Sequence, residues 1–440
     1  MRRVAFIVLA LSAFVAGCAS HRPSSFVPQS DAMRGPGIVA GIHPNLSDGA
    51  RVKAAIAEAL RALPAPTAPG IAIAVNYHGK AFFYYQGVEK IGGRAVTGDT
   101  IFEMGSVTKS FTGILLANAV NLGIKRVALN DPPGKWIAIH GNPNATARNP
   151  VATTCAVPTA TPLPPTSYGS FKYMTLFELA THTSGLPDVI SGVYGTNIGR
   201  QCFSPQMFLN YVEGGKFPHP PAPWVYSNFG FGTLGYVLQN VYATNLKKPP
   251  SWIQIARQQI LDPLGMTSTF DLNIPKKYRA NYAVGYLFNK AGQPERQLHW
   301  LWDAWPAAGT LRSTAPDMMR YLRMAMNVAG PANLRAAAQI AQRPYVKVSP
   351  YGGQGLAWET IPLYTASTPS PPPPPIAWKD GGTGGFSSWI GAVRKPDVAQ
   401  PMGIVVMFSI GNQDDVGPFA RAILTALYLE DRPHRSGGSR

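Results

Sequence analysis

The stretch FEMGSVTKSFTGILLANAV, residues 102–120, places a serine and a lysine three positions apart at the start of an apolar run. An α-helix brings positions i and i+3 onto one face, so the side chains of Ser106 and Lys109 can touch. A serine becomes a nucleophile beside a base, and a lysine serves as that base when burial and neighbouring charge lower its pKa. The alternative is that Lys109 simply extends to the surface. Ser106 is the only serine in the chain with a lysine three positions on, and this favours the pair.

Length and composition indicate a large globular protein. The 440 residues are 45% hydrophobic and 14% charged, which is typical of a well-packed chain, and this length favours two lobes. Lys and Arg number 39 against 22 Asp and Glu, but the basic residues are scattered and no nucleic-acid motif is present. A nucleic-acid partner is therefore not expected. The positive charge favours solubility and attraction to anionic envelope surfaces.

The first residues predict export. MRR is followed by the apolar run VAFIVLALSAFVAG, which is too short for an ordinary membrane span and resembles a signal peptide over residues 1–17. It ends in Val15-Ala16-Gly17-Cys18, which resembles the lipobox of bacterial lipoproteins, so lipid is expected on Cys18. Ala19 suggests sorting to the outer membrane, with the body facing the periplasm. The alternative is an ordinary secretory signal with an incidental Cys18, and both interpretations export the protein.

The other two cysteines are Cys155 and Cys202. In an oxidising compartment they are predicted to form a disulfide, and the alternative is two unpaired thiols. Neither C-x-x-C nor H-E-x-x-H occurs, so no metal site is expected.

Strand and helix patterns predict a two-part organisation. Residues 18–45 are rich in Pro, Ser and Gly and are expected to be a flexible tether to a folded domain over residues 46–435. The domain begins with a helix in LSDGARVKAAIAEALRALP and a β-hairpin around His78-Gly79, and it ends with the strands FSSWIGAVRK and MGIVVMFSIG before the helix GPFARAILTALYLE. Strands at both ends predict an α/β lobe over about residues 46–105 and 300–435, with a helical lobe inserted over about 106–299.

Two more motifs follow the Ser106 segment. APWVYSNFGFG contains Tyr226-Ser227-Asn228, and IAWKDGGTGGFSSWIG contains Lys379-Asp380-Gly381, expected immediately before an edge strand. In this order the three motifs resemble the S-x-x-K, Y-x-N and K-T-G motifs of the serine penicillin-recognising enzymes. The resemblance is closest to class C β-lactamases, with the related D,D-peptidases and family esterases. LATHTSGLP, YAVGY, QGLAWE and AAGTLRSTAPDMMRYL support it, over roughly residues 50–430.

The resemblance implies the two-lobed α/β (α+β) fold of β-lactamases and transpeptidases, in which an antiparallel sheet lobe built from both termini carries an inserted all-helical lobe. Ser106 would be acylated by a strained lactam or an acyl-D-alanyl peptide. Lys109 and Tyr226 would share the proton transfers, and the ammonium groups of Lys109 and Lys379 would lower the pKa of Tyr226. No cofactor is implied.

The same resemblance implies the groups that bind substrate. Asn228 would hydrogen-bond the substrate amide, and Gly381, Gly382 and Thr383 would line the site. The oxyanion hole would be formed by the backbone N–H groups of Ser106 and Gly382.

Each residue also has a structural interpretation. The alternative is that Tyr226 and Asn228 belong to a turn and a helix cap, and that Lys379 is a charged surface residue. The order of the three motifs favours a catalytic set instead. No G-x-S-x-G nucleophile motif accompanies His182 in LATHTSGLP, so His182 is expected to be structural. Glu103 is also expected to be structural.

One residue departs from the family pattern. Asp380 stands where a hydroxyl residue usually helps to bind the carboxylate of a β-lactam or a terminal D-alanine. A carboxylate there repels that anion. Either Asp380 turns away and Lys379 and Thr383 bind the substrate, or the preferred substrate lacks the anion. Asn412 in SIGNQDD is a further candidate for carboxylate binding.

The leading prediction is a monomeric envelope lipoprotein that hydrolyses β-lactams through an acyl-enzyme. A D,D-carboxypeptidase or endopeptidase of peptidoglycan and a carboxylesterase are the close alternatives, because all three share the nucleophile. A penicillin-binding sensor, which acylates and stays acylated, is the alternative from a different class. The sequence does not show the role of the polyproline run 371–375.

Overall fold

The computed structural model describes residues 46–63, 68–137, 169–188, 208–209, 212–213, 217–243, 249–300, 305–364, 373–393, 401–411 and 415–431. Several predictions therefore fall outside the described residues: the signal peptide, the lipid on Cys18, the tether, the disulfide between Cys155 and Cys202, and Asn412. Of the polyproline run 371–375, residues 373–375 are described. In the part of the chain that is described, no helix is long and apolar enough to cross a membrane.

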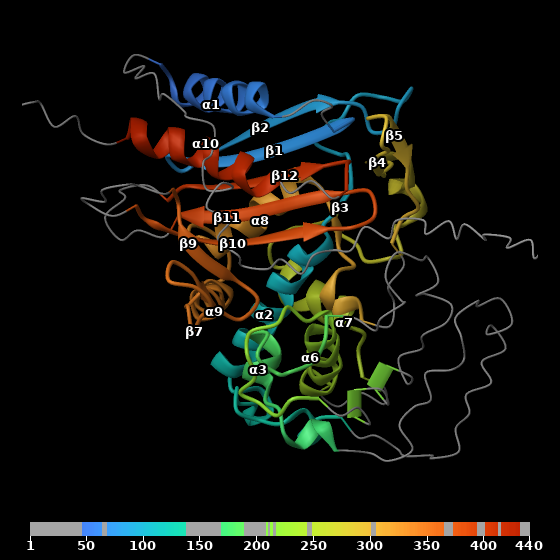
Figure 1. Cartoon of the computed structure of the whole chain (residues 1–440), viewed down its shortest axis with the longest axis vertical. Helices are drawn as coiled ribbons and strands as arrows, with labels where there is room; N and C mark the ends of the chain where they lie inside the picture. The colour runs from blue at the N-terminus through green and yellow to red at the C-terminus, as the bar shows by residue number, and fades with distance from the viewer. Residues whose placement is uncertain are drawn as a thin grey trace, which may run out of the picture.

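A single large sheet organises the upper part of the molecule (Figure 1). Its eight strands run in the order β2-β1-β12-β11-β10-β9-β8-β7, and every neighbouring pair is antiparallel. The strands are β1 (Gly70–Tyr77), β2 (Lys80–Gly87), β7 (Val346–Lys347), β8 (Gly353–Gln354), β9 (Glu359–Pro362), β10 (Pro375–Gly382), β11 (Ser387–Val393) and β12 (Gly403–Phe408). Because β1 pairs with β12, the two ends of the described chain build one sheet, as predicted.

The terminal elements form as their sequence signals predict. Helix α1 (Asp48–Ala62) is capped by Ser47, whose hydroxyl accepts a hydrogen bond from the backbone N–H of Ala50. The β1–β2 hairpin turns at His78 and Gly79, both with positive φ, which is the backbone conformation that a two-residue hairpin requires. The last helix, α10 (Val416–Glu430), lies beside α1 on one face of the sheet (Figure 1).

A hydrophobic core lies on each face of the sheet, as strand β1 shows. Its Ile71, Ile73 and Val75 side chains pack in the core under α1 and α10. Its alternate residues, Ala72 and Ala74, join the larger core that also contains α8 (Ala315–Ala325). Alternation along the strand sends the two sets to opposite faces.

The inserted segment leaves and re-enters the sheet lobe at one place. The short strand β3 (Phe102–Glu103) pairs with β6 (Arg312–Ser313), so the two ends of the insertion lie side by side. Helices α2, α3, α6 and α7 lie below the sheet (Figure 1). The helices of the insertion are α2 (Thr108–Asn121), α3 (Leu176–Ala180), α6 (Asn228–Val241) and α7 (Trp252–Ala256), which continues into the π-helix η6 (Arg257–Leu261).

The remaining elements are short. A second hairpin, β4 (Tyr286–Phe288) with β5 (Pro294–Arg296), falls within the insertion. Helix α9 (Ala332–Ala341) follows α8. The 3₁₀ helices are η1 (Gly105–Val107), η2 (Ile124–Arg126), η3 (Pro133–Lys135), η5 (Ser170–Lys172), η7 (Lys276–Asn281) and η8 (Pro306–Ala308).

Strand β10 corrects one prediction. Lys379 was expected immediately before an edge strand, but β10 begins at Pro375 and contains the whole Lys379-Asp380-Gly381 motif. Nor is β10 an edge strand, because it pairs with both β9 and β11. Its pairing with β9 stops at Trp378, however, so residues 379–382 lack a strand partner on that side. The Lys379-Asp380-Gly381 motif thus lies in an interior strand, at a stretch that has no strand partner on the β9 side.

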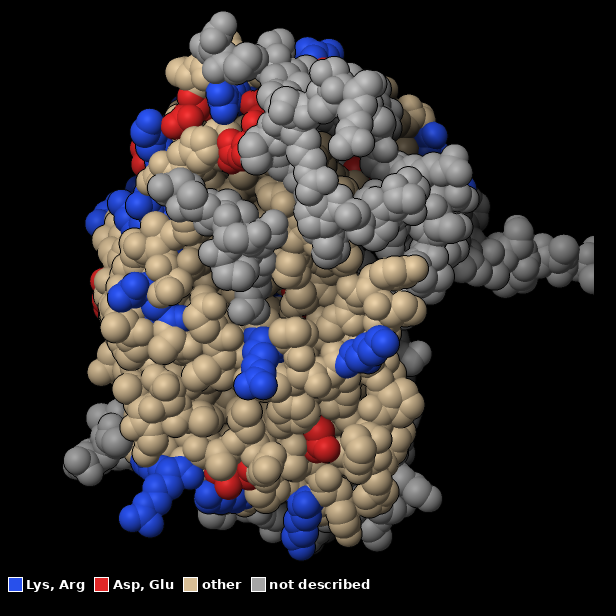
Figure 2. Space-filling model, turned by 90° about the vertical axis from the view of Figure 1, so that its left-hand side faces the viewer, with Lys and Arg blue, Asp and Glu red and all other residues tan. Residues whose placement is uncertain are grey.

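Charge is spread thinly over the face drawn in Figure 2. Lys and Arg side chains are mostly separated there by uncharged surface, as the scatter of basic residues in the sequence predicts. That face carries no continuous basic strip of the kind that binds a nucleic-acid backbone.

Candidate active site

Ser106 lies in η1, at the point where the chain turns into α2. The end of β10 packs directly against this turn. A Cβ added to Gly381 would lie 2.1 Å from the carbonyl oxygen of Met104 and 2.9 Å from the backbone nitrogen of Ser106. Ser388 on β11 fixes the same contact, because its hydroxyl donates to the Met104 carbonyl at 2.8 Å. Only a glycine at position 381 permits this approach.

The backbone of Gly382 faces the same turn. The N–H of Thr383 donates to the carbonyl of Phe386, toward β11, at 2.9 Å. Backbone N–H groups alternate in direction along a strand, so the Gly382 N–H points to the opposite side, where residues 379–382 have no strand partner. There Gly105, at φ +47°, packs so closely that a Cβ on it would lie 2.7 Å from the Gly382 nitrogen. The backbone N–H groups of Ser106 and Gly382, which are predicted to form the oxyanion hole, therefore lie on either side of the same position.

Lys109 is fully buried and its ammonium nitrogen has three oxygen neighbours. Nζ lies 3.0 Å from Ser106 Oγ, 2.5 Å from Asn228 Oδ1 and 2.7 Å from the carbonyl oxygen of Ala308. Burial, and then the charge of Lys379, hold the pKa of Lys109 well below its ordinary value. A neutral amine here donates its two N–H groups to Asn228 and Ala308 and has its lone pair left for the Ser106 hydroxyl proton.

Tyr226 completes the contacts of the serine. Its phenol donates to Ser106 Oγ at 2.6 Å, and its ring lies 4.8 Å from Lys109 Nζ and 5.3 Å from Lys379 Nζ. The prediction that the two lysines lower its pKa is wrong. Burial, and then the nearby Asp380 carboxylate, raise the pKa of Tyr226 well above its ordinary value. Tyr226 is therefore a protonated donor and Lys109 the base of the pair.

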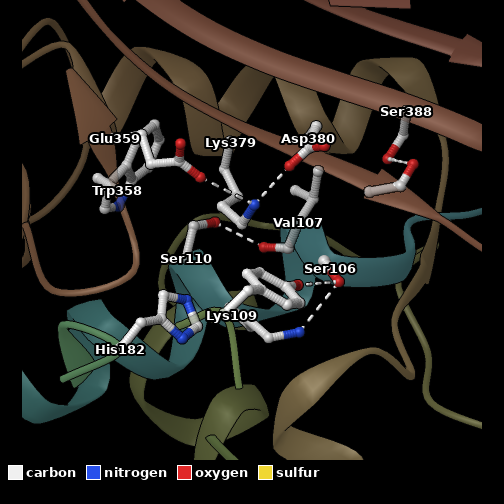
Figure 3. A network of polar contacts seen from close by, with 12 residues as sticks. Ser106, Val107, Lys109, Ser110, His182, Trp358, Glu359, Lys379, Asp380 and Ser388 are labelled. Carbon is white, nitrogen blue, oxygen red and sulfur yellow. Dashed lines mark hydrogen bonds and ion pairs between the residues drawn. The ribbon is translucent and has the colours of Figure 1, made fainter. Parts of the chain in front are cut away.

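Lys379 is bracketed by two carboxylates (Figure 3). Its Nζ donates to Asp380 Oδ1 at 2.5 Å and lies 3.5 Å from Glu359 Oε1. Burial opposes the charged lysine, but Asp380 and Glu359 outweigh it and raise the pKa of Lys379. Burial raises the pKa of Glu359 to about 7. The side chain of Lys379 is fully buried, whereas that of Asp380 is 40% exposed.

Comparison with known proteins decides the family. The Beta-lactamase family model matches residues 56–427 of this chain. The chain belongs to the β-lactamase family. The β-lactamase of Lysobacter lactamgenus is 29% identical over 371 residues, which are 78% of this chain and 82% of the relative. The β-lactamase of Yersinia enterocolitica is 29% identical over 302 residues, and the match spans 66% of this chain and 64% of that relative.

Solved structures confirm the predicted fold of this β-lactamase family member. A class C β-lactamase matches with a TM-score of 0.65 and 24% identity, covering 87% of this chain and 98% of that chain. A D-alanine carboxypeptidase AmpC from Burkholderia cenocepacia matches with a TM-score of 0.62 and 25% identity, covering 85% and 99%. Family and fold together make the chain a serine hydrolase by class.

Asn228 occupies the third position of the Y-x-N motif of this β-lactamase family member, at the start of α6. Its Oδ1 accepts from Lys109, and its Nδ2 donates to Asp188 Oδ1 at 2.7 Å. The Asn228 amide thus links Lys109 to Asp188 and fixes the position of the Lys109 amine. The predicted hydrogen bond from Asn228 to a substrate amide stays a prediction, as does substrate binding by Thr383. The side chain of Thr383 is buried, and its hydroxyl has no hydrogen-bond partner among the described residues.

His182 and Glu103 have structural contacts, as expected. The Nδ1 atom of His182 accepts from the backbone N–H of Ser227 at 3.0 Å, which fixes the segment that carries Tyr226. Because Nδ1 accepts, the proton of the neutral imidazole is on Nε2. Glu103 accepts from the phenol of Tyr282 at 2.6 Å and lies 3.5 Å from Arg312, across the β3–β6 junction.

Two residues of this β-lactamase family site, Glu359 and Asp188, are not predicted from the sequence motifs. Each was inside or beside a quoted segment: Glu359 ends QGLAWE, and Asp188 follows LATHTSGLP. The feature of the sequence that could have identified both residues is an acidic side chain at the end of a family motif. Among the described residues, no cluster of three or more His, Cys, Asp or Glu is placed to hold a metal ion.

Proposed function

We propose that the protein hydrolyses β-lactams through an acyl-enzyme on Ser106. One observation carries the proposal: Ser106 Oγ contacts both the Lys109 amine at 3.0 Å and the Tyr226 phenol at 2.6 Å. A hydroxyl between a buried amine and a protonated phenol has a base for its own proton and an acid for the leaving group.

Acylation follows from these contacts. As Ser106 Oγ attacks the lactam carbonyl carbon, Lys109 takes the hydroxyl proton. The negative carbonyl oxygen accepts hydrogen bonds from the N–H groups of Ser106 and Gly382. When the C–N bond breaks, Tyr226 gives its proton to the nitrogen, and the Lys109 ammonium restores the phenol. Lys109 then returns to the neutral amine.

Deacylation repeats the sequence with water as the nucleophile. Lys109 takes a proton from the water as it attacks the ester carbonyl, and the same two N–H groups stabilise the oxyanion. When the ester bond breaks, Tyr226 gives its proton to Ser106 Oγ, and the Lys109 ammonium restores the phenol. Every step uses side chains and backbone groups of this chain.

Tyr226→Phe tests the role of the phenol. The variant keeps the ring but cannot protonate the leaving nitrogen, so we expect kcat/KM for a chromogenic cephalosporin to fall by about 10²- to 10³-fold. The drop should lie in kcat, measured by initial rates. Tyr84→Phe on β2 is the matched control and should leave the rate unchanged. A Tyr226→Phe rate within about threefold of the wild type would remove the phenol from the mechanism.

A D,D-carboxypeptidase is the second candidate, favoured by the likeness to the D-alanine carboxypeptidase and by Asp380. Residues 19–440 should be assayed with a chromogenic cephalosporin, an acyl-D-Ala-D-Ala peptide and a short aryl ester. Fast cephalosporin turnover supports the β-lactamase proposal. Peptide or ester turnover with slow cephalosporin reaction supports a peptidase or esterase. Stoichiometric labelling without turnover supports the penicillin-binding sensor.

We also propose that the protein is an envelope lipoprotein facing the periplasm. The basic start, the short apolar run and the lipobox ending in Cys18 support this. The mass of the N-terminal peptide tests it, because the proposal requires a peptide that begins with lipid-modified Cys18. An unmodified Cys18 behind an intact leader would contradict it.

A further inference from the structure

We propose that Asp380 makes this site select acyl substrates that carry no free carboxylate beside the reacting carbonyl. The inference rests on the proposed acyl-enzyme at Ser106 and ranks its substrates: β-lactams and other acyl compounds in which this carboxylate is absent or masked react faster than the free acids.

The arrangement of the Lys379 ion pair carries the inference. The ammonium is fully buried, and the carboxylate that contacts it at 2.5 Å is 40% exposed. Glu359, the second carboxylate on Lys379, is only 6% exposed. The part of this ion pair that solvent reaches is therefore the Asp380 carboxylate and not the Lys379 ammonium.

The charges around the serine reinforce this. Two lysines, Lys109 and Lys379, share the site with the carboxylates of Asp188, Glu359 and Asp380. Lys109 in its base form is neutral, and Glu359, whose pKa is raised to about 7, is only partly charged at neutral pH. The carboxylates of Asp188 and Asp380 still outnumber the one charged lysine, Lys379, so no surplus positive charge is left for an anionic substrate.

Electrostatic repulsion by Asp380 determines which substrates the site favours. A substrate carboxylate placed beside Asp380 is repelled, and Lys379 compensates little because its charge is already matched by Asp380 at 2.5 Å. A carboxylate accepts hydrogen bonds and donates none, so the partner that fits Asp380 is an N–H or O–H group. An ester or amide in place of the anion removes the repulsion.

One pair of probes isolates this effect: a chromogenic cephalosporin and its methyl ester, which differ only in the ring carboxylate. The rate of acylation of the protein is measured for each by intact mass. We expect the wild type to react with the methyl ester at least about 10-fold faster. Asp380→Asn should shrink that ratio by about 10-fold, chiefly by faster reaction with the free acid. Asp380→Thr should act in the same direction.

The remote surface variant Asp262→Asn is the matched control and should keep the wild-type ratio. A wild type that prefers the free acid, or an equal ratio in the wild type and Asp380→Asn, would overturn the inference while leaving acylation of Ser106 intact. If neither probe nor a short aryl ester labels Ser106, the proposed function itself fails. Ser106→Ala shows which labelling belongs to the serine.

Discussion

Replacing Ser106 with alanine should lower kcat/KM for every substrate by at least about 10⁴-fold and abolish covalent labelling. The Ser106 hydroxyl is hydrogen-bonded to both the Lys109 amine and the Tyr226 phenol, and it is the attacking atom of the proposed mechanism. Rates with a chromogenic cephalosporin and an aryl ester, together with intact mass after exposure to a fluorescent penicillin, measure the effect.

Ser110→Ala is the matched control for this loss. Ser110 is one turn further along α2, is fully buried, and donates its hydroxyl proton to the Val107 carbonyl. Its loss should change thermal stability and leave labelling of Ser106 intact. Continued labelling of the Ser106→Ala protein would show that the nucleophile is a different residue.

Lys109→Arg should be the second largest loss, about 10³- to 10⁴-fold in kcat/KM. An arginine keeps the positive charge and much of the length, but its pKa above about 12 leaves it protonated, so it cannot accept the Ser106 proton. The base form of Lys109 exists because burial holds its pKa well below the ordinary value. In the wild type, kcat/KM should therefore fall as the pH drops through the pKa of Lys109, because the ammonium has no lone pair.

The surface variant Lys135→Arg is the control, since the Lys135 side chain is 45% exposed and pairs with Asp131 and not with a residue of the site. It should retain full activity and the wild-type pH profile. If Lys109→Arg retains activity within about 10-fold of the wild type, the neutral amine is not the base, and the proton passes to Tyr226 instead.

Much of the architecture could be predicted from local patterns. The Ser-Asp start of α1, the His78-Gly79 turn and the late strands are short-range signals, and each forms where expected. The pairing of β1 with β12 followed from apolar strands at both ends of the domain. The contact of Ser106 with Lys109 followed from helical spacing alone.

What escaped prediction depends on contacts between distant segments. Glu359 reaches Lys379 because β9 pairs with β10, a register that no single stretch specifies. The raised pKa of Tyr226 follows from its burial and from Asp380, which lies 154 positions later in the chain. The start of β10 also escaped prediction, because the strand begins at Pro375, inside a proline run that is typical of a loop.

The most direct test of an acyl-enzyme on Ser106 is a time course of intact mass during reaction with excess chromogenic cephalosporin. We predict a single adduct per protein, located on the peptide that contains Ser106, which disappears while many equivalents of substrate are hydrolysed. An adduct on another residue, or substrate hydrolysis with no adduct and undiminished in Ser106→Ala, would contradict the account.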